Sequence, residues 1–414
     1  MVSESPSRIV ITGVGASTPL GNSFSEIGDA LQAGRSGIDW YDAGTFNRYQ
    51  KHAAATVKEL RIRKEKDTLV STEYFENSSR IEQFMIRPAS HALADAGINP
   101  KADSSEPKKR IGIIAGIGAE QLKDWERDFL DNGRDVFEAS RQPSLVHRVA
   151  QMLGVNGPAT TVAAACASSG YALAIGKTWL TTGLVDACVV GGCDVLSPTA
   201  LAAFHNLRAL SRRDDDPQKA SRPFDRNRDG FVMGEGGVFF VLERQHAAKD
   251  RQCKIYGELA GVGMSSDASH MVTPCSDPVE ASRAITEALA DANLSPEQVD
   301  YINAHAAGTP VGDAAEAGAI RNAFGPVAAK IPVSSTKSMS GHLISAAAAF
   351  EALACLVAIE RNMIPPTINL DNPDEDCCLR HVPHQSIASP VHVAASNSFG
   401  FGGSNLCLVL KSAA

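Results

Sequence analysis

One cysteine stands where an apolar strand is expected to give way to an apolar helix. Thr161 to Ala165 have the composition of a buried strand, and from Ser168 onward apolar residues recur at helical spacing. Cys166 therefore lies at a helix N-terminus, where unpaired backbone N–H groups and the helix dipole favour thiolate over thiol. That is a suitable position for a nucleophile. The alternative is a small buried hydrophobic side chain, the commoner role of a free cysteine.

Two histidines in the second half of the chain also follow strands. His305 comes directly after the predicted strand Tyr301–Ala304, and ligands gather at the carboxyl ends of strands in α/β folds. His342 follows a strand that begins at Val333, and it precedes a long apolar helix. An internal repeat, described below, predicts that Cys166 and His342 occupy related helix N-termini that face one another. A lone histidine is more often structural, but two opposite a cysteine favour a catalytic group.

Two ionisable residues accompany His342 in otherwise apolar surroundings. Lys337 precedes the histidine, and Glu351 follows it inside the predicted helix. Burying either charge is costly unless the charge is paired. A salt bridge with no further role is therefore one interpretation, and support of the catalytic group is the other.

The last glycine-rich run is Asn397–Asn405, with the sequence NSFGFGGSN. Its glycines allow sharp turns that expose backbone N–H groups, and Phe399 and Phe401 add bulk beside them. The run has neither the lysine of a phosphate-binding loop nor a dinucleotide-binding fingerprint. We therefore interpret it as part of an oxyanion hole.

Strands and helices alternate along the whole chain, which is typical of mostly parallel sheets covered by helices. The order of elements in residues 255–410 repeats the order in residues 8–242, and residues 340–357 take the place of the helix after Cys166. We therefore predict an N-terminal half, 1–250, that holds the cysteine and a C-terminal half, 251–414, that holds the histidines. Their two sheets are expected to stack about a pseudo-twofold axis and to enclose a shared helical layer.

Composition excludes several classes of protein. The 414 residues are 44% hydrophobic and 21% charged, which suits a soluble globular protein, and a net charge of −8 argues against a nucleic-acid binder. No stretch approaches the ~18 apolar residues of a membrane span, so we expect no membrane insertion and a cytoplasmic location. The nine cysteines show no zinc-type spacing with histidine, and we expect reduced thiols.

Seven segments together resemble the elongating (type I/II) β-ketoacyl-acyl-carrier-protein synthases, condensing enzymes of the thiolase superfamily. The resemblance covers essentially the whole chain. It implies an α/β thiolase fold, in which duplicated βαβαβαββ halves form a five-layered α-β-α-β-α structure, and a homodimer. The matching segments are Cys166–Gly170, Ser221–Asp225 with Asp229–Glu235, Ser265–Ala268, Asn303–His305, Ser334–His342, Pro365–Leu370 and Asn397–Asn405.

The resemblance also implies an activity. The protein would be an acyltransferase of the 3-oxoacyl-acyl-carrier-protein synthase II type. Cys166 would take an acyl group from a carrier protein, and decarboxylative Claisen condensation with malonyl carrier protein would yield β-ketoacyl carrier protein in fatty acid or related elongation. His305 and His342 would hold the malonyl thioester, and Lys337 would order the histidines. The backbone N–H groups of Cys166 and Phe401 would form the oxyanion hole, and Phe401 with Phe399 the gate of the acyl pocket.

Further residues carry implied binding roles. Thr309 and Gly402 would bind substrates carried on phosphopantetheine, and no cofactor would be required. A structural monovalent or divalent cation, present in some relatives, would be held by Asn303, Glu351, Asn397 and Ser398. Acyl carrier protein is acidic, so a basic patch is expected to receive it. The candidates are Arg208, Arg212 and Arg213, followed by Arg80, Arg134 and the run Arg61–Lys66.

The chain departs from the family pattern at four positions. Ala307 replaces a threonine that bonds pantetheine in relatives, a loss of about 1 kcal/mol. Ala306, Ser345 and Ala348 stand where relatives usually have glycine, and their bulk is expected to narrow the site or shift its substrate range. Two alternatives within the family are a polyketide ketosynthase subunit and a poorly active, non-catalytic partner subunit. Retention of the cysteine, both histidines and the lysine argues against the second.

Two enzymes outside that group share part of the chemistry. A degradative thiolase uses a second cysteine as base, and no Cys-x-Gly element lies near the carboxyl end. A papain-like hydrolase pairs cysteine with histidine, but its local signature is missing. Acyl chain length and the pathway served do not follow from the sequence.

Overall fold

The computed structural model describes residues 8–41, 52–62, 69–102, 108–118, 120, 122–133 and 143–413. Strands of both halves join in one large sheet with the order β13-β11-β10-β15-β16-β9-β1-β8-β6-β4-β5. The strands from the N-terminal half are β1 (Ile9–Ser17), β4 (Ile111–Gly116), β5 (Ala159–Val162), β6 (Ala187–Asp194) and β8 (Gly236–Arg244). Those from the C-terminal half are β9 (Gly257–Ser266), β10 (Tyr301–Asn303), β11 (Pro332–Ser334), β13 (Arg380–His381), β15 (Val393–Gly400) and β16 (Ser404–Lys411).

The two halves of this sheet are built on the same plan, which confirms the predicted repeat. From the centre outward, the N-terminal half runs β1, β8, β6, β4, β5, and the C-terminal half runs β9, β16, β15, β10, β11, with the two-residue strand β13 added at its edge. In both halves the first strand is central, the last lies beside it, and the two outermost strands are parallel. A short antiparallel pairing of Val10 and Ile11 with Glu258 and Gly257 joins the halves. The two predicted sheets are therefore joined to each other through their first strands.

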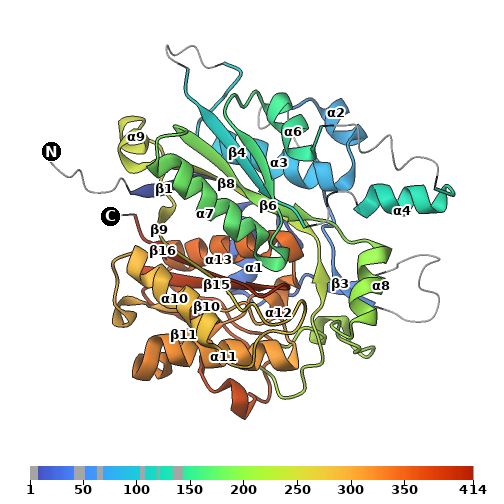
Figure 1. The fold of residues 1–414 in the computed structure, drawn as a ribbon, viewed down its shortest axis with the longest axis vertical. Coiled ribbons are helices and arrows are strands. Elements are labelled where there is room, and N and C mark those ends of the chain that lie inside the picture. The colour runs from blue at the N-terminus through green and yellow to red at the C-terminus, as the bar shows by residue number, and fades with distance from the viewer. Residues whose placement is uncertain are drawn as a thin grey trace.

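Helices cover both faces of each half and complete the predicted five layers (Figure 1). The helix α3 (Arg80–Asp95) packs on the outer face of β1, β8 and β6, and α10 (Val279–Asp291) packs on the outer face of β9 and β16. Between the halves lie α7 (Ser168–Thr181) and α13 (Ala347–Arg361), which contact each other and the inner faces of both. Parallel strands require such helical crossovers.

The central helices approach each other closely because small residues line their contact. A side chain on Gly170 of α7 would place its Cβ 3.1 Å from the Cβ of Ala348 on α13. The Ser169 hydroxyl accepts a hydrogen bond of 3.0 Å from the backbone N–H of Ala349. The methyl group of Ala348, one of the departures from the family pattern, is therefore accommodated by a glycine opposite it. Residues from Ala347 to Ile359 are buried, which explains a helix that is apolar on all sides.

The remaining helices and short strands complete the fold. They include α1 (Phe24–Gln32), α2 (Thr72–Asn77), α4 (Leu122–Leu130), α6 (Leu145–Leu153), α8 (Pro198–Asn206), α9 (Gln245–Asp250), α11 (Pro310–Phe324) and α12 (Lys337–Ser340). Two small sheets are formed by β2 (Ile38–Tyr41), β3 (His52–Ala55) and β7 (Met233–Gly234), and by β12 (Met363–Ile364) and β14 (Ile387–Ala388). Within the described residues, no helix combines the length and the apolar character that crossing a membrane requires.

Candidate active site

Cys166 lies in a tight turn at the start of α7, as the sequence predicted. The turn is a single 3₁₀ turn, Ala165–Ala167, and it continues directly into the helix. Ala165 has φ +49°, a left-handed conformation that is strained for a residue with a Cβ. The Ser168 hydroxyl holds this conformation, because it accepts from the Ala164 N–H at 2.9 Å and donates to the Ala165 carbonyl at 2.6 Å. Cys166 itself is 9% exposed.

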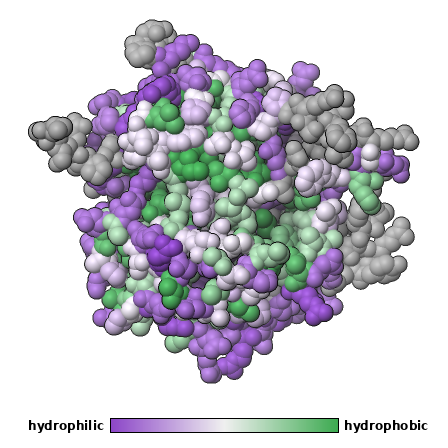
Figure 2. All heavy atoms as spheres, viewed as in Figure 1, coloured by the Kyte–Doolittle hydropathy of each residue, from purple (hydrophilic) through white to green (hydrophobic). Residues whose placement is uncertain are grey.

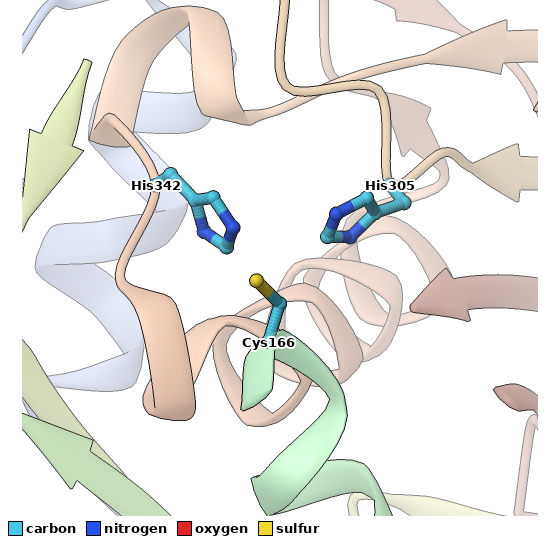
Figure 3. A group of neighbouring side chains, drawn as sticks. All are labelled: Cys166, His305 and His342. Atoms are coloured by element: carbon cyan, nitrogen blue, oxygen red, sulfur yellow. The ribbon is translucent and has the colours of Figure 1, made fainter. Parts of the chain in front are cut away.

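The same turn recurs in the C-terminal half, at a different position from the one predicted. Ile344 also has φ +49°, and the 3₁₀ turn Ile344–Ala346 runs directly into α13. Ser345 is therefore the symmetry-related counterpart of Cys166, and the prediction that His342 holds that place is wrong. His342 belongs to the segment between α12 and this turn. It still reaches the site, because that segment passes beside Cys166 (Figure 3).

Cys166, His305 and His342 form a triangle. The cysteine sulphur and one nitrogen of each histidine lie within 4.8 Å of one another. The imidazole rings are 5.3 Å apart between centroids and meet edge to face at 82°. Both rings point toward the space beside the sulphur (Figure 3). All three residues line one cleft, together with Phe204, Phe231, Phe399 and Phe401.

Hydrogen bonds fix the tautomer of each histidine. The Nδ1 atom of His305 lies 3.3 Å from the Nζ atom of Lys337, and an ammonium group can only donate. The Nδ1 atom of His342 accepts from the backbone N–H of Ile344 at 3.2 Å. In both rings Nδ1 is therefore an acceptor, and the ring proton resides on Nε2. The site presents two N–H donors.

Electrostatics keeps both rings neutral. Burial and the positive charge of Lys337 lower the pKa of His305 and His342 well below the usual value, and His342 lowers that of His305 further. Lys337 is fully buried, and its ammonium group also contacts the carboxylate of Glu351. Burial raises the pKa of Glu351 to about 7, although Lys337 opposes that shift. Lys337 thus contacts His305 directly and acts on both rings through its charge.

The triangle has the wrong surroundings for a metal centre. A histidine that binds a metal normally donates its other ring N–H to an acceptor, which leaves the ligating nitrogen free. Here the other nitrogen of each ring accepts a hydrogen bond instead. The nitrogen that is left to bind a metal, Nε2, therefore bears a proton. The arrangement is suited to stabilising negative charge on a substrate oxygen.

Burial opposes the thiolate that the helix N-terminus was expected to favour. It raises the pKa of Cys166 to about 11, while the charge of Lys337 and a hydrogen bond from the Phe401 backbone lower it. In the free enzyme, burial therefore outweighs the groups that favour the thiolate. Cys166 still has a lower pKa than the buried Cys377 and Cys407, each raised to about 12.

Phe401 occupies the place predicted for an oxyanion-hole and gate residue. It opens the turn Phe401–Gly403 between β15 and β16, and its backbone hydrogen-bonds the Cys166 sulphur. Gly402 has φ +84°, a conformation that suits glycine, and it is exposed at the turn tip. The Phe401 ring lies 6.1 Å from that of Phe204, and Thr309 lines the same cleft.

Two carboxylates that the sequence analysis missed support the backbone around His305. Glu316 accepts hydrogen bonds from the N–H groups of His305 and Ala306, and Asp313 accepts from the N–H groups of Phe224 and Gly308. Both lie on α11, and burial raises their pKa values, to about 7 for Glu316 and about 6 for Asp313. The sequence did contain a signal for them, because two acidic residues three positions apart are unusual in a mostly apolar helix.

The residues predicted to receive a carrier protein differ in exposure. Arg208 and Arg212 are exposed, and Arg208 follows α8, the helix that brings Phe204 to the cleft. Arg213 is half-buried beside Asp215. Arg80 is bound to the buried carboxylate of Glu235, which indicates a structural role. Residues 63–66 and Arg134 lie outside the described part of the chain.

The residues predicted to hold a cation do not all face one point. Ser398 contacts Glu351 beneath α13, whereas the neighbouring Asn397 donates to Glu316 of α11 on the opposite face of the sheet. Such alternation is inherent in a strand. The side-chain oxygens of Asn303 and Asn397 are both buried and have no hydrogen-bond partner among the described residues. All four residues carry a side-chain oxygen that suits a cation, but Asn397 contacts the face of the sheet opposite Glu351 and Ser398.

The fold and this cysteine–histidine site define a condensing enzyme of the thiolase type, and comparison with known proteins agrees. The family model for the beta-ketoacyl synthase N-terminal domain matches residues 6–248, and the model for the C-terminal domain matches residues 256–371. The chain therefore belongs to the β-ketoacyl synthase family.

Named relatives match along nearly the full length. The chain is 39% identical to 3-oxoacyl-[acyl-carrier-protein] synthase 2 of Synechocystis and 37% identical to that of Coxiella burnetii, with 98% of each chain covered. Among solved structures, a type II polyketide ketosynthase bound to its acyl-carrier protein has a TM-score of 0.88 at 30% identity, covering 99% of this chain and 100% of that one. A beta-ketoacyl synthase from Burkholderia phymatum gives 0.85 at 31%, with the same coverage.

The raised pKa of Cys166 predicts how its alkylation depends on pH. The thiolate fraction should rise about tenfold per pH unit between pH 7 and pH 10, because the pKa of about 11 lies above that range. Iodoacetamide labelling, read by mass spectrometry of the Cys166 peptide, measures this rate. The exposed Cys378 serves as the control and is expected to label first. A Cys166 rate that levels off below pH 8 would show a stabilised thiolate and contradict the burial argument.

Proposed function

We propose that this protein catalyses decarboxylative condensation of malonyl-acyl-carrier protein with an acyl group held on Cys166, which elongates the acyl chain of a fatty acid. The observation that carries the proposal is the pair of neutral histidines whose Nδ1 atoms accept hydrogen bonds beside the cysteine. Family membership and the names of the relatives support the same reaction.

The first half-reaction transfers an acyl group to Cys166. The thiol sulphur attacks the acyl thioester of the carrier's phosphopantetheine, and the backbone N–H groups of Cys166 and Phe401 stabilise the oxyanion of the tetrahedral intermediate. The bond from carbonyl carbon to pantetheine sulphur then breaks. The proton lost by Cys166 is balanced by the proton gained by the departing pantetheine thiolate. The exchange therefore proceeds without a resting thiolate.

The second half-reaction uses the histidines. The malonyl thioester oxygen accepts the Nε2–H bonds of His305 and His342, so that the electrons of the bond to the departing carbon dioxide move onto that oxygen as an enolate. The enolate carbon attacks the acyl-Cys166 carbonyl. Cys166 leaves as a thiolate and takes a proton from solvent water, and the β-ketoacyl product remains on the carrier. Two preorganised donors in a buried site are effective for this step because they need no reorganisation.

A polyketide ketosynthase subunit is the second candidate. The acyl-carrier-protein complex of a type II polyketide ketosynthase and the ishigamide ketosynthase/chain length factor each match with a TM-score of 0.88 at 30% identity. The chemistry at Cys166 is the same in both candidates, and the difference lies in the acyl groups accepted. Fatty acid elongation is preferred because the relatives at 37–39% identity carry that name.

A homodimer is part of the proposal. The strand β5 ends the large sheet next to the Cys166 turn, its residues are partly exposed, and such an edge is a template for pairing with another chain. Tyr171 and Ile175 of the adjacent α7 are only partly buried. Figure 2, in the same view as Figure 1, shows hydrophobic residues gathered near the middle of the face, surrounded by hydrophilic residues. Light scattering should report a mass twice the 43.7 kDa of one chain.

Two sequence-based expectations remain predictions. A structural cation would be held by residues among Asn303, Glu351, Asn397 and Ser398, and it would supply only charge balance near α13, where Lys337 already contacts Glu351. The cytoplasmic location is likewise a prediction. Neither enters the reaction described above, which requires no cofactor.

The half-reactions are separable by substitution. Cys166→Gln should accept no acyl group and still release carbon dioxide from malonyl carrier protein, because the histidines perform that step. His305→Ala should keep Cys166 acylation and lose decarboxylation by about 100-fold, the usual effect of removing one oxyanion donor. Radiolabelled carbon dioxide release and intact-protein mass spectrometry measure the two steps. Decarboxylation at the parent rate in His305→Ala would overturn the role given to that histidine.

Docking of the carrier protein is tested by charge reversal. Arg208→Glu should raise the apparent Michaelis constant for carrier-bound substrates and weaken its salt dependence, because the carrier is acidic. It should leave activity on acyl-coenzyme A unchanged, since that substrate needs no protein surface. Lys249→Glu is the matched control, because Lys249 is exposed on α9, on the opposite side of the molecule from α8 (Figure 1). Equal losses on both substrates, or in both variants, would exclude the docking role.

A further inference from the structure

A buried carboxylate lies at the end of β6, and the reaction described above does not use it. Asp194 is 6% exposed. Its Oδ2 atom accepts from the Ser345 hydroxyl at 2.7 Å and from the Ser345 backbone N–H at 3.2 Å, and its Oδ1 atom accepts from the Val195 N–H at 2.9 Å. Burial of a charge is costly, and these donors offset that cost. The carboxylate is thereby tied to the turn that begins α13.

Ser345 links three segments of the chain. Its hydroxyl donates to Asp194 and accepts from the backbone N–H of Gly118 at 2.8 Å. Gly118 follows β4, and Asp194 ends β6, so that the turn Ile344–Ala346 is fastened to two neighbouring strands of the N-terminal half. Ser345 is fully buried. A glycine or alanine at this position offers no hydroxyl and would leave the Gly118 N–H without its acceptor.

The fastened turn contains the group that sets the tautomer of His342. Ile344 has φ +49°, which is unfavourable for a β-branched residue and persists only when neighbouring bonds hold it. In that conformation its N–H reaches the Nδ1 atom of His342. The neighbouring Ser345 bears two of the bonds to Asp194. Release of those bonds would let Ile344 relax and withdraw its N–H.

We propose that Asp194 and Ser345 are positioning residues for His342, because they hold the strained Ile344 turn that keeps the Nε2–H of His342 directed at the substrate. The proposal rests on the proposed function. Without the Ile344 N–H, the proton of His342 moves freely between its two nitrogens. An unprotonated Nε2 atom would face the malonyl thioester oxygen and repel the charge that develops there.

The Ser345→Ala variant distinguishes positioning of His342 from general stabilisation of the fold, because only the first affects decarboxylation more than acylation. We expect decarboxylation of malonyl carrier protein to fall about tenfold, the usual cost of a hydrogen bond to a charged group. Acylation of Cys166 should stay within about twofold of the parent, because the Cys166 turn is held by other bonds. Ser90→Ala is the matched control, since Ser90 is also fully buried and its hydroxyl also accepts a backbone N–H, from Leu69 at 2.7 Å. It should change neither half-reaction.

Repeating the Ser345→Ala substitution in a protein that lacks His342 shows whether Ser345 acts through that histidine. In a His342→Ala protein, Ser345→Ala should cause no further loss of decarboxylation. A further loss there, an equal fall in both half-reactions, or an unchanged rate in folded Ser345→Ala would each overturn the proposal. If Ser345→Ala does not fold, Ser345→Gly is used in its place in every measurement, because it removes the same hydroxyl. A parent protein and Ser90→Ala control that release no carbon dioxide would instead refute the proposed function.

Discussion

The site depends on one constraint, namely that the Nδ1 atom of each histidine accepts a hydrogen bond. Lys337 provides the donor for His305, and the backbone of Ile344 provides it for His342. Ionisable residues with shifted pKa values often mark a catalytic site. Here the function depends instead on which nitrogen of each histidine ring carries the proton. Both ring protons are therefore held on Nε2. The same bonds exclude metal ligation and favour an oxyanion.

The duplicated fold is what brings these donors together. Each half supplies a left-handed residue, a 3₁₀ turn and a helix, and the close contact of α7 with α13 sets the two turns side by side. The nucleophile occupies one turn, and Ser345 occupies the equivalent place in the other. The strained backbone conformations of Ala165 and Ile344 are stabilised by hydrogen bonds of serine hydroxyls and of Asp194. A symmetric scaffold thus supports an asymmetric reaction.

The sequence was sufficient to predict the elements, the repeat and the three central residues, because strand-to-helix junctions, glycines and helical periodicity are local signals. It failed where the answer depends on contacts distant in the chain. Nothing local marks Ile344 as left-handed, so the register of the symmetry was misplaced by three residues. The helix terminus at Cys166 predicted a lowered pKa for the thiol. Burial, which the sequence does not report, raises that pKa and has the larger effect. Arg80 could not be separated from surface charges, because its partner Glu235 lies on another segment.

The tautomers of His305 and His342 test the account most directly. Proton and nitrogen NMR of the protein labelled with ¹⁵N-histidine distinguishes a protonated nitrogen from an unprotonated one, and the His305→Ala and His342→Ala variants assign the signals. At pH 7 we expect both residues to be neutral, with Nε2 protonated and Nδ1 unprotonated, because burial and Lys337 lower their pKa values. A proton on Nδ1 of either ring, or an imidazolium at either position, would contradict the central claim.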